Sequence, residues 1–341
     1  MTSLSPLVRA RVLLLFAGLA STGTGSVTAQ ETHHDPYFMP TEARVLKKLP
    51  RVILRNMIED RDGAIWFASF AGPIRYDGKN FTNFSDEVGL PRTRVFSLAE
   101  TKAGDLWFGS ITGGATRYDG KSFEKWTVKD GLASNDIHWI LEDRKGAIWL
   151  STTKGVSRFD GESFTTYTVE DGLPHNSVYV MAEDKSGVLW FGTQGGICSF
   201  DGKSFTDLAP RVNQEFTNIR AIVEDKAGNL WFGGEAGAFR FDGKSVTVFN
   251  AQNGLLHDFV GSLIVDKDGQ VWFGHPDVRN GGASRYDGKS FTHFTQAEGL
   301  ASTNVYCMLE DTAGNIWFGS VDAGACRYDG KTFTRFSDET R

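Results

Sequence analysis

The sequence is poor in the residues that build metal and disulfide sites. Its 341 residues include three cysteines, Cys198, Cys307 and Cys326, and these do not have the close spacing of a metal-binding motif. We therefore expect all three to be small buried side chains. Neither a bound metal nor a cofactor is predicted.

The chain also has no excess of positive charge. It contains 36 Lys and Arg against 42 Asp and Glu, for a net charge of −6, and no basic stripe stands out. Proteins bind nucleic acids largely because Lys and Arg neutralise phosphates, so nucleic acid is not an expected partner.

Common catalytic motifs are missing as well. The sequence has no Gly-x-Ser-x-Gly elbow and no His-Glu-x-x-His pair. Its Asp-x-x-Gly turns, such as residues 60–63, lack the downstream Glu of a calcium-binding EF-hand loop, and one turn supplies too few oxygens for this ion. We interpret these Asp side chains as acceptors of local backbone N–H groups in hairpin turns.

Long apolar runs are confined to the N-terminus. Two arginines precede an apolar stretch over residues 12–20, and small residues follow as far as Ala29. This pattern predicts a signal peptide over residues 1–29 and a periplasmic or secreted mature protein. Residues 30–48 are expected to form an N-terminal tail. No later run approaches 18 residues, so no membrane span is expected in the mature chain.

Glycine and aromatic residues are abundant, with 39 Gly, 26 Phe and nine Trp. Seven of the tryptophans recur every 41 to 45 residues, at Trp66, Trp107, Trp149, Trp190, Trp231, Trp272 and Trp317. An Asp-Gly turn keeps the same period, with its glycine at Gly78, Gly120, Gly161, Gly202, Gly243, Gly288 and Gly330. Two landmarks with one period indicate a sevenfold repeat.

The fourth repeat shows what each unit forms. Four short runs at 178–183, 188–193, 197–200 and 204–208 are separated by turn residues, which predicts a four-stranded antiparallel sheet. We predict an all-β fold, a seven-bladed β-propeller over residues 49–341, with the recurring Trp buried between blades. A stacked solenoid is the alternative, but its end repeats would need polar caps, and repeats one and seven look like the others.

The repeat also resembles a known family. Residues 172–205 read G-L-P-x-N-x-V-x-x-x-x-E-D-x-x-G-x-L-W-F-G-T-x-G-G-x-x-x-F-D-G-K-x-F, which is similar to the two-component regulator propeller repeat. The resemblance implies an extracytoplasmic sensor region that binds a ligand, often a carbohydrate fragment, and signals to a kinase. The sequence reaches Arg341 without a kinase or membrane segment, so the expectation is a free-standing sensor-like propeller.

Positions that differ between repeats are the candidates for ligand recognition. The second residue of the first strand reads Arg55, Phe96, His138, Tyr179, Arg220, Gly261 and Tyr306 around the ring. The residue four positions earlier reads Arg51, Arg92, Ser134, His175, Phe216, His257 and Ser302. Such side chains can stack on sugars or clamp a carboxylate. The predicted ligand-binding residues are Arg51, Arg55, Arg92, His138, His175, Tyr179, Arg220, His257, His275 and Tyr306.

His275 opens an insertion in the sixth repeat, residues 275–282, that we expect to cover one side of the same mouth. The favoured function is recognition of a small molecule or saccharide fragment at the channel mouth, with a separate signalling or surface protein as a further partner. A protein-interaction scaffold and a lyase-type propeller enzyme are the alternatives. A pocket rich in Arg and aromatic groups favours the first function, and a flat mouth favours the scaffold. Two titratable groups within hydrogen-bond reach would favour the enzyme.

Overall fold

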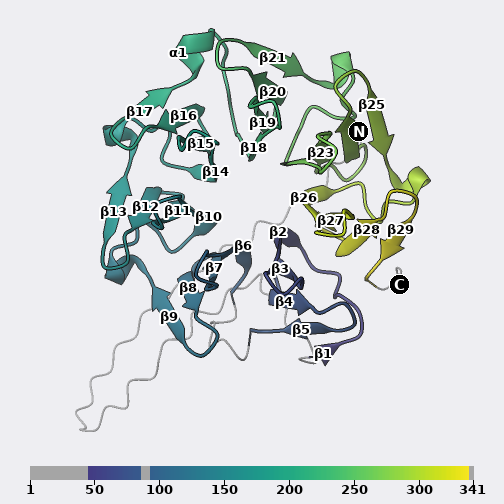
Figure 1. Cartoon of the computed structure of the whole chain (residues 1–341), viewed down its shortest axis with the longest axis horizontal. Coiled ribbons are helices and arrows are strands. Elements are labelled where there is room, and N and C mark those ends of the chain that lie inside the picture. Colours follow the sequence, from purple (N-terminus) through teal and green to yellow (C-terminus); the bar gives the residue numbers. More distant parts are fainter. Residues whose placement is uncertain (1–44, 86–92, 338–341) are drawn as a thin grey trace, which may run out of the picture. The chain divides into compact units, whose positions relative to one another are not determined.

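The computed structural model describes residues 45–85 and 93–337. In this part of the chain seven antiparallel sheets stand around a common axis, so the predicted seven-bladed β-propeller is confirmed (Figure 1). The expected signal peptide and most of the expected tail lie outside the described residues, as does Arg92.

Each blade runs outward from the axis in four strands, and the first blade has β1 as a fifth strand on its outer edge. The innermost strands are β2 (Leu54–Glu59), β6 (Val95–Glu100), β10 (Ile137–Glu142), β14 (Val178–Glu183), β18 (Ala221–Glu224), β22 (Ser262–Val265) and β26 (Val305–Glu310). The second strands are β3 (Ile65–Ser69), β7 (Leu106–Ser110), β11 (Ile148–Thr152), β15 (Leu189–Thr193), β19 (Leu230–Gly234), β23 (Val271–His275) and β27 (Ile316–Ser320). The third strands are β4 (Gly72–Tyr76), β8 (Gly114–Tyr118), β12 (Gly155–Phe159), β16 (Ile197–Phe200), β20 (Gly237–Phe241), β24 (Gly282–Tyr286) and β28 (Ala325–Tyr328). The outermost strands are β5 (Phe81–Asn83), β9 (Phe123–Trp126), β13 (Phe164–Tyr167), β17 (Phe205–Asp207), β21 (Val246–Phe249), β25 (Phe291–Phe294) and β29 (Phe333–Arg335).

Helix is almost absent from the described residues. The connections between blades contain one four-residue helix, α1 (Ala209–Val212), and four 3-10 turns. The 3-10 turns cover Val128–Asp130, Val169–Asp171, Ala251–Asn253 and Gln296–Glu298, and each begins with a capping box. These connections return the chain from the rim of one blade to the axis of the next.

Closure of the ring uses residues from both ends of the propeller. The short strand β1 (Val45–Leu46), within the expected tail, pairs with β5 of its own blade. Leu49 forms a parallel bridge with Ser337 after the last strand. The Thr312 backbone N–H donates to Glu59 Oε2 at 2.7 Å, across the junction of blades seven and one. A ring closed in this way rules out the stacked solenoid.

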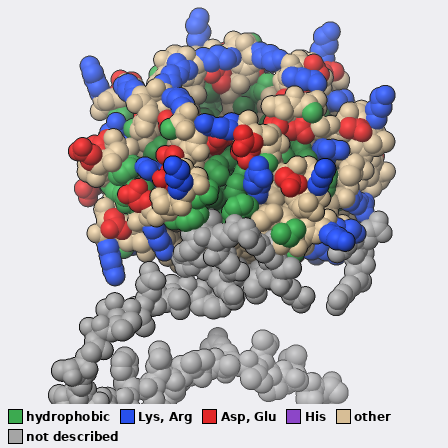
Figure 2. All heavy atoms as spheres, turned by 60° about the horizontal axis from the view of Figure 1, so that its bottom comes forward, with side chains coloured by type: hydrophobic (Ala, Val, Ile, Leu, Met, Phe, Trp, Pro, Cys, Tyr) green, Lys and Arg blue, Asp and Glu red, His purple; other side chains and the backbone are tan. Residues whose placement is uncertain are grey.

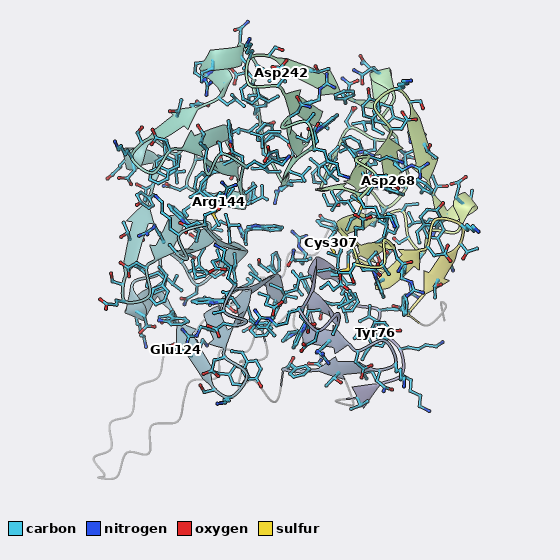
Figure 3. The ribbon with its side chains drawn as sticks, in the orientation of Figure 1. Tyr76, Glu124, Arg144, Asp242, Asp268 and Cys307 are labelled. Atoms are coloured by element: carbon cyan, nitrogen blue, oxygen red, sulfur yellow. The ribbon has the colours of Figure 1, made fainter. Side chains whose placement is uncertain are left out.

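The recurring Trp packs between blades, as predicted. Trp190 of blade four lies 5.7 Å from Phe232 and 6.0 Å from Phe241 of blade five, measured between ring centroids. Side chains fill the spaces between neighbouring sheets in this way all round the ring, and they form seven hydrophobic clusters among the described residues (Figure 3). The three cysteines are buried and free, as expected.

A Glu-Asp pair, present in five of the seven blades, holds the hairpin turn and joins it to the preceding blade, as blade four shows. Asp184 Oδ1 accepts the backbone N–H groups of Ser186 and Val188, and its Oδ2 accepts the Trp190 indole N–H at 2.8 Å. The same Trp–Asp bond recurs in six of the seven blades described. The interpretation of the Asp-x-x-Gly turns as local acceptors is therefore confirmed. Glu183 Oε2 accepts a backbone N–H from Arg144 of the preceding blade.

Candidate functional site

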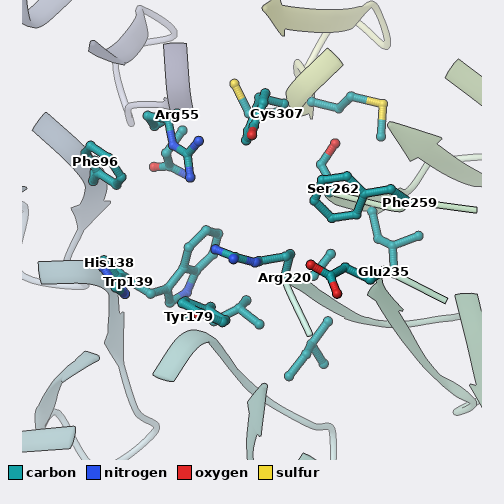
Figure 4. A pocket seen from close by; sticks show the side chains of 18 residues that line it. Arg55, Phe96, His138, Trp139, Tyr179, Arg220, Glu235, Phe259, Ser262 and Cys307 are labelled. Carbon is teal, nitrogen blue, oxygen red and sulfur yellow. The ribbon is translucent and has the colours of Figure 1, made fainter. Parts of the chain in front are cut away.

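A cavity of about 380 Å³ opens on the axis, where the first strands begin (Figure 4). All seven residues at the second position of the predicted first strands line it: Arg55, Phe96, His138, Tyr179, Arg220, Gly261 and Tyr306. Five of these are predicted ligand-binding residues. The structure thus brings together Arg55, His138, Tyr179, Arg220 and Tyr306 from five different blades. We call the seven residues the axial belt.

A β-bulge turns the belt residues toward the axis. In β2 the register against β3 shifts between Leu54 and Asn56, so Arg55 has no cross-strand partner. The same shift occurs at the belt position of β6, β10, β14 and β26. Bulges bend a strand and redirect a side chain, and they are common beside functional sites. In blades five and six the belt residue comes just before the ladder begins.

The belt residues stack on one another around the ring. The Arg55 guanidinium carbon lies 4.7 Å from the Phe96 ring centroid and 4.4 Å from that of Tyr306. The Arg220 guanidinium carbon lies 3.6 Å from the Tyr179 centroid. Such cation–π contacts hold a guanidinium in place without neutralising its charge.

His138 completes the stack between Phe96 and Tyr179. Its ring centroid lies 6.3 Å from that of Phe96 and 5.6 Å from that of Tyr179. Its Nδ1–H donates to the Val178 carbonyl oxygen at 3.1 Å. Burial lowers the pKa of His138, and the charges of Arg55 and Arg220 lower it further. The imidazole is therefore neutral at neutral pH, with Nε2 unprotonated.

The positive charge in the belt is not neutralised by the protein. Within residues 45–85 and 93–337, neither Arg55 nor Arg220 forms an ion pair with a carboxylate. Burial lowers the pKa of Arg55; Tyr306 offsets part of this effect, and the Arg220 charge adds to it. Arg220 Nε and Ser262 Oγ are buried without a hydrogen-bond partner in the described structure. Nine buried side-chain atoms in the described structure have no hydrogen-bond partner, and among them these two belong to residues that line the cavity. A ligand in the cavity would be able to satisfy them.

Blade six interrupts the belt. Gly261 has no side chain, and a Cβ at this position would come within 2.7 Å of the Pro276 ring. Phe259 lines the cavity beside this gap, together with Glu235 from the β19–β20 loop of blade five. The Trp139 indole extends into the pocket toward Arg220 (Figure 4). The cavity is therefore asymmetric, with cationic and aromatic groups along most of its wall and an acidic side chain near the gap.

The other ring of predicted residues has a different position. His175 Nδ1 accepts the Ser177 backbone N–H at 2.9 Å, and His257 Nδ1 accepts that of Phe259 at 3.0 Å. Arg51 is exposed, and its Nε donates to the Asp322 carbonyl oxygen. None of these three side chains lines the cavity. They hold the loops that enter each blade.

His275 is wholly buried at the end of β23. Its Nδ1 lies 3.0 Å from the Phe259 carbonyl oxygen, and its Nε2 lies 2.9 Å from Ser284 Oγ. Burial lowers its pKa to about 4. His275 has no exposed surface and does not line the cavity, so the structure does not bring it together with the other predicted ligand-binding residues. The insertion that follows it does not line the cavity either.

Several lining residues were not predicted as site residues. Trp139 is the one aromatic residue at its position in the seven repeats, and Glu235 is the one acidic residue at its position, so comparison of the repeats held a signal for both. Phe259 gave no such signal, because its place depends on the loop held by His257 and His275. In the described residues, no three His, Cys, Asp or Glu side chains are grouped so as to hold a metal ion.

The model of the family described as "Two component regulator propeller" matches residues 89–112, 131–154, 172–195, 213–236, 254–277 and 299–322. The chain belongs to the two-component regulator propeller family. These matches cover repeats two to seven, so the resemblance read from repeat four is confirmed. No curated protein sequence matches this member of the family.

Solved structures share the fold of this family member. The extracellular domain of the hybrid two-component system BT3049 from B. thetaiotaomicron is 22% identical, with a TM-score of 0.73 over 83% of this chain. The match spans 39% of that protein's chain. An inactive virginiamycin B lyase from Staphylococcus aureus with quinupristin is 15% identical, with a TM-score of 0.63 over 82% of this chain and 96% of the lyase. YCF48 bound to D1 peptide is 12% identical, with a TM-score of 0.62 over 85% of this chain and 98% of YCF48.

Proposed function

We propose that the protein is a sensor-like propeller that binds a small molecule or saccharide fragment at the channel mouth. The observation that carries this proposal is the axial belt, where Arg220 Nε and Ser262 Oγ are buried without partners in the described structure. Groups left unsatisfied in a preformed concave site are what a specific ligand would satisfy.

The shape of the mouth favours a ligand over a flat protein partner. The cavity is walled by aromatic and guanidinium groups from several blades, whereas a scaffold surface would be closed and flat (Figure 4). The outer surface drawn in Figure 2 shows Lys and Arg interspersed with Asp and Glu over the described residues. The axial belt therefore differs from the face drawn in Figure 2 in carrying charged side chains of one sign, those of Arg55 and Arg220.

A location outside the cytoplasm is part of the proposal. The expected signal peptide and the extracellular sensor domain among the similar folds support it. None of the helices in residues 45–85 and 93–337 has the length and hydrophobicity to cross a bilayer. N-terminal sequencing of exported protein should begin near Gln30, and an intact Met1 on mature protein would contradict the proposed export.

A ligand screen tests the binding function. In a thermal-shift screen of sugars and metabolites, a true ligand at 100-fold above its Kd should add about 2.7 kcal/mol of stability. Tyr179→Ala, inside the cavity, should reduce the shift. Lys203→Ala, in the β16–β17 turn at the opposite end of a blade, should leave it unchanged. A hit that responds only to Lys203→Ala would place the site elsewhere.

A further inference from the structure

We infer that the ligand of this cavity is a hydroxylated acid whose anionic group lies between Arg55 and Arg220. This inference rests on the proposed binding function and names the chemical class of the ligand. It follows from the charge of the axial belt, the direction its groups face, and the different chemistry of blades five and six.

The two belt arginines differ from Arg61 and Arg75, which pair with carboxylates, and from Arg240, Arg285 and Arg327, which have no ion pair among the described residues but do not line the cavity. Arg61 Nε lies 2.6 Å from Glu100 Oε1, and Arg75 Nε lies 3.4 Å from Asp60 Oδ2. Arg55 and Arg220 have no such partner in the described residues, although both are partly buried. Two unpaired like charges in a partly buried site are unfavourable unless an anion binds with them.

The stacking determines which part of each group is left for a ligand. The faces of Phe96 and Tyr306 are covered by Arg55, and the face of Tyr179 is covered by Arg220. Ring edges and guanidinium N–H groups are then what the belt presents to the axis. Aromatic edges are electropositive, and guanidinium N–H groups suit the paired oxygens of a carboxylate or phosphate. Both features favour a negatively charged group on the axis.

The side of the cavity formed by blades five and six favours hydroxyl groups beside the anionic group. Ser262 Oγ is unsatisfied there in the described structure, and Glu235 adds a carboxylate to the lining of the cavity. A carboxylate accepts hydrogen bonds and repels a second anion, so the ligand should place donors beside Glu235. A molecule with an acid group and hydroxyls beside it, such as a sugar acid, matches both requirements.

The anionic group could belong to a carboxylate or to a phosphate ester, so the test includes both. Calorimetric titration of the wild-type protein with galacturonate, galactose 6-phosphate and neutral galactose separates the three cases. We expect at least one of the two acids to bind, and galactose to bind about 10- to 100-fold more weakly than that acid or not at all. Arg55→Met and Arg220→Met should each weaken binding of the acid by a similar factor.

Arg240→Met is the matched control for losing an arginine that stacks on aromatic rings outside the cavity. Arg240 also stacks on aromatic rings, 5.8 Å from the Trp231 centroid and 5.9 Å from that of Phe249, but it does not line the cavity. This change should leave binding of the acid unaltered. A loss equal to that of Arg220→Met would mean that the belt arginines act only through the packing of the blades, and the inference would be wrong.

A measurement without an organic ligand gives a second test. At constant ionic strength, replacing chloride with sulfate should raise the Tm of the wild-type protein more than that of Arg55→Met or Arg220→Met. Equal shifts in all three proteins would overturn the anion site. Equal binding of galactose and galacturonate would overturn the acid inference while leaving the proposed binding function intact. If neither acid binds and the wider screen finds neutral ligands, the acid inference is also overturned and the proposed binding function stands.

Discussion

Two rings of variable residues lie near the same channel mouth, four residues apart in every repeat, and they have different roles. The axial belt lines a cavity, whereas His175 and His257 of the other ring accept backbone N–H groups in their own loops. Ser134 and Ser302 make the same type of bond in their repeats. Serine and histidine thus share one structural role there. Variation between repeats therefore identifies a binding position only when the backbone directs the side chain to the axis.

The largest expected effect is a loss of stability, and it should differ between substitutions of two tryptophans. Trp190→Ala removes a ring packed between blades and its bond to Asp184, and should cost about 3–5 kcal/mol of unfolding free energy. Trp139→Ala removes a ring that extends into the cavity, and should cost clearly less. Denaturant unfolding measures both changes. A larger loss for Trp139→Ala would mean that the cavity wall, rather than the blade interface, stabilises the ring of blades.

The second prediction compares the two rings directly by ligand affinity. Arg220→Ala should weaken binding of the ligand by about 1.5–3 kcal/mol, the range for charge-assisted hydrogen bonds. His257→Ala, from the other ring, should leave the affinity nearly unchanged because His257 does not line the cavity. Calorimetry on both variants with the best compound from the screen tests this contrast. Equal losses would show that the two rings act as one site.

When stability is measured in place of affinity, the order of the two variants should reverse, and His257→Ala should have the larger effect. His257→Ala removes the acceptor of the Phe259 N–H and should cost about 1 kcal/mol, the usual value of one such bond. Arg220→Ala should cost less, because the lost stacking on Tyr179 is offset by removal of a partly buried charge whose Nε has no hydrogen-bond partner in the described residues. His257→Asn, which can accept a local N–H, should recover part of the loss. No recovery would exclude the loop bond as the source of stability.

A smaller effect is expected from pH. The pKa of His138 is lowered by burial and by Arg55 and Arg220, while Asp136 acts in the opposite direction. A bound acid would raise this pKa, so affinity for the acid should increase a few-fold as the pH falls below neutrality. Without ligand the sign is opposite, and stability should decrease as the pH falls through about 6.5, the value for an unfolded His. Calorimetric titrations across this range should lose the pH dependence of affinity in His138→Gln, whereas stability should keep the part that comes from His275, whose pKa burial lowers to about 4.

The smallest effect is expected at Lys203 in the turn between β16 and β17. Lys203→Ala should change stability by less than about 0.5 kcal/mol, as for most surface sites, and should not change affinity. Thermal unfolding and calorimetry of this variant provide the baseline for the other four predictions. A marked loss of affinity would show that the turn end of the blades also contacts the ligand.

Local features of the fold were predictable from single repeats. In repeat four the predicted strands at 178–183 and 197–200 match β14 and β16, and the other two differ from β15 and β17 by one residue at their ends. Strand alternation and turn residues act over a few positions, so the sequence displays them directly. The β-bulge is the exception, because no distinctive residue marks it at Arg55 or Tyr179.

The sequence by itself determined the number of blades, the Trp–Asp scaffold and the set of residues from which a site could be built. Only the tertiary structure decided which of these residues meet. Arg55 stacks on Tyr306 because ring closure brings the first and last blades together, although the two residues lie far apart in the chain. The repeat period carries no information about a contact across that junction. The charge balance of the cavity arises in the same way, since it depends on which side chains from different blades share the axis.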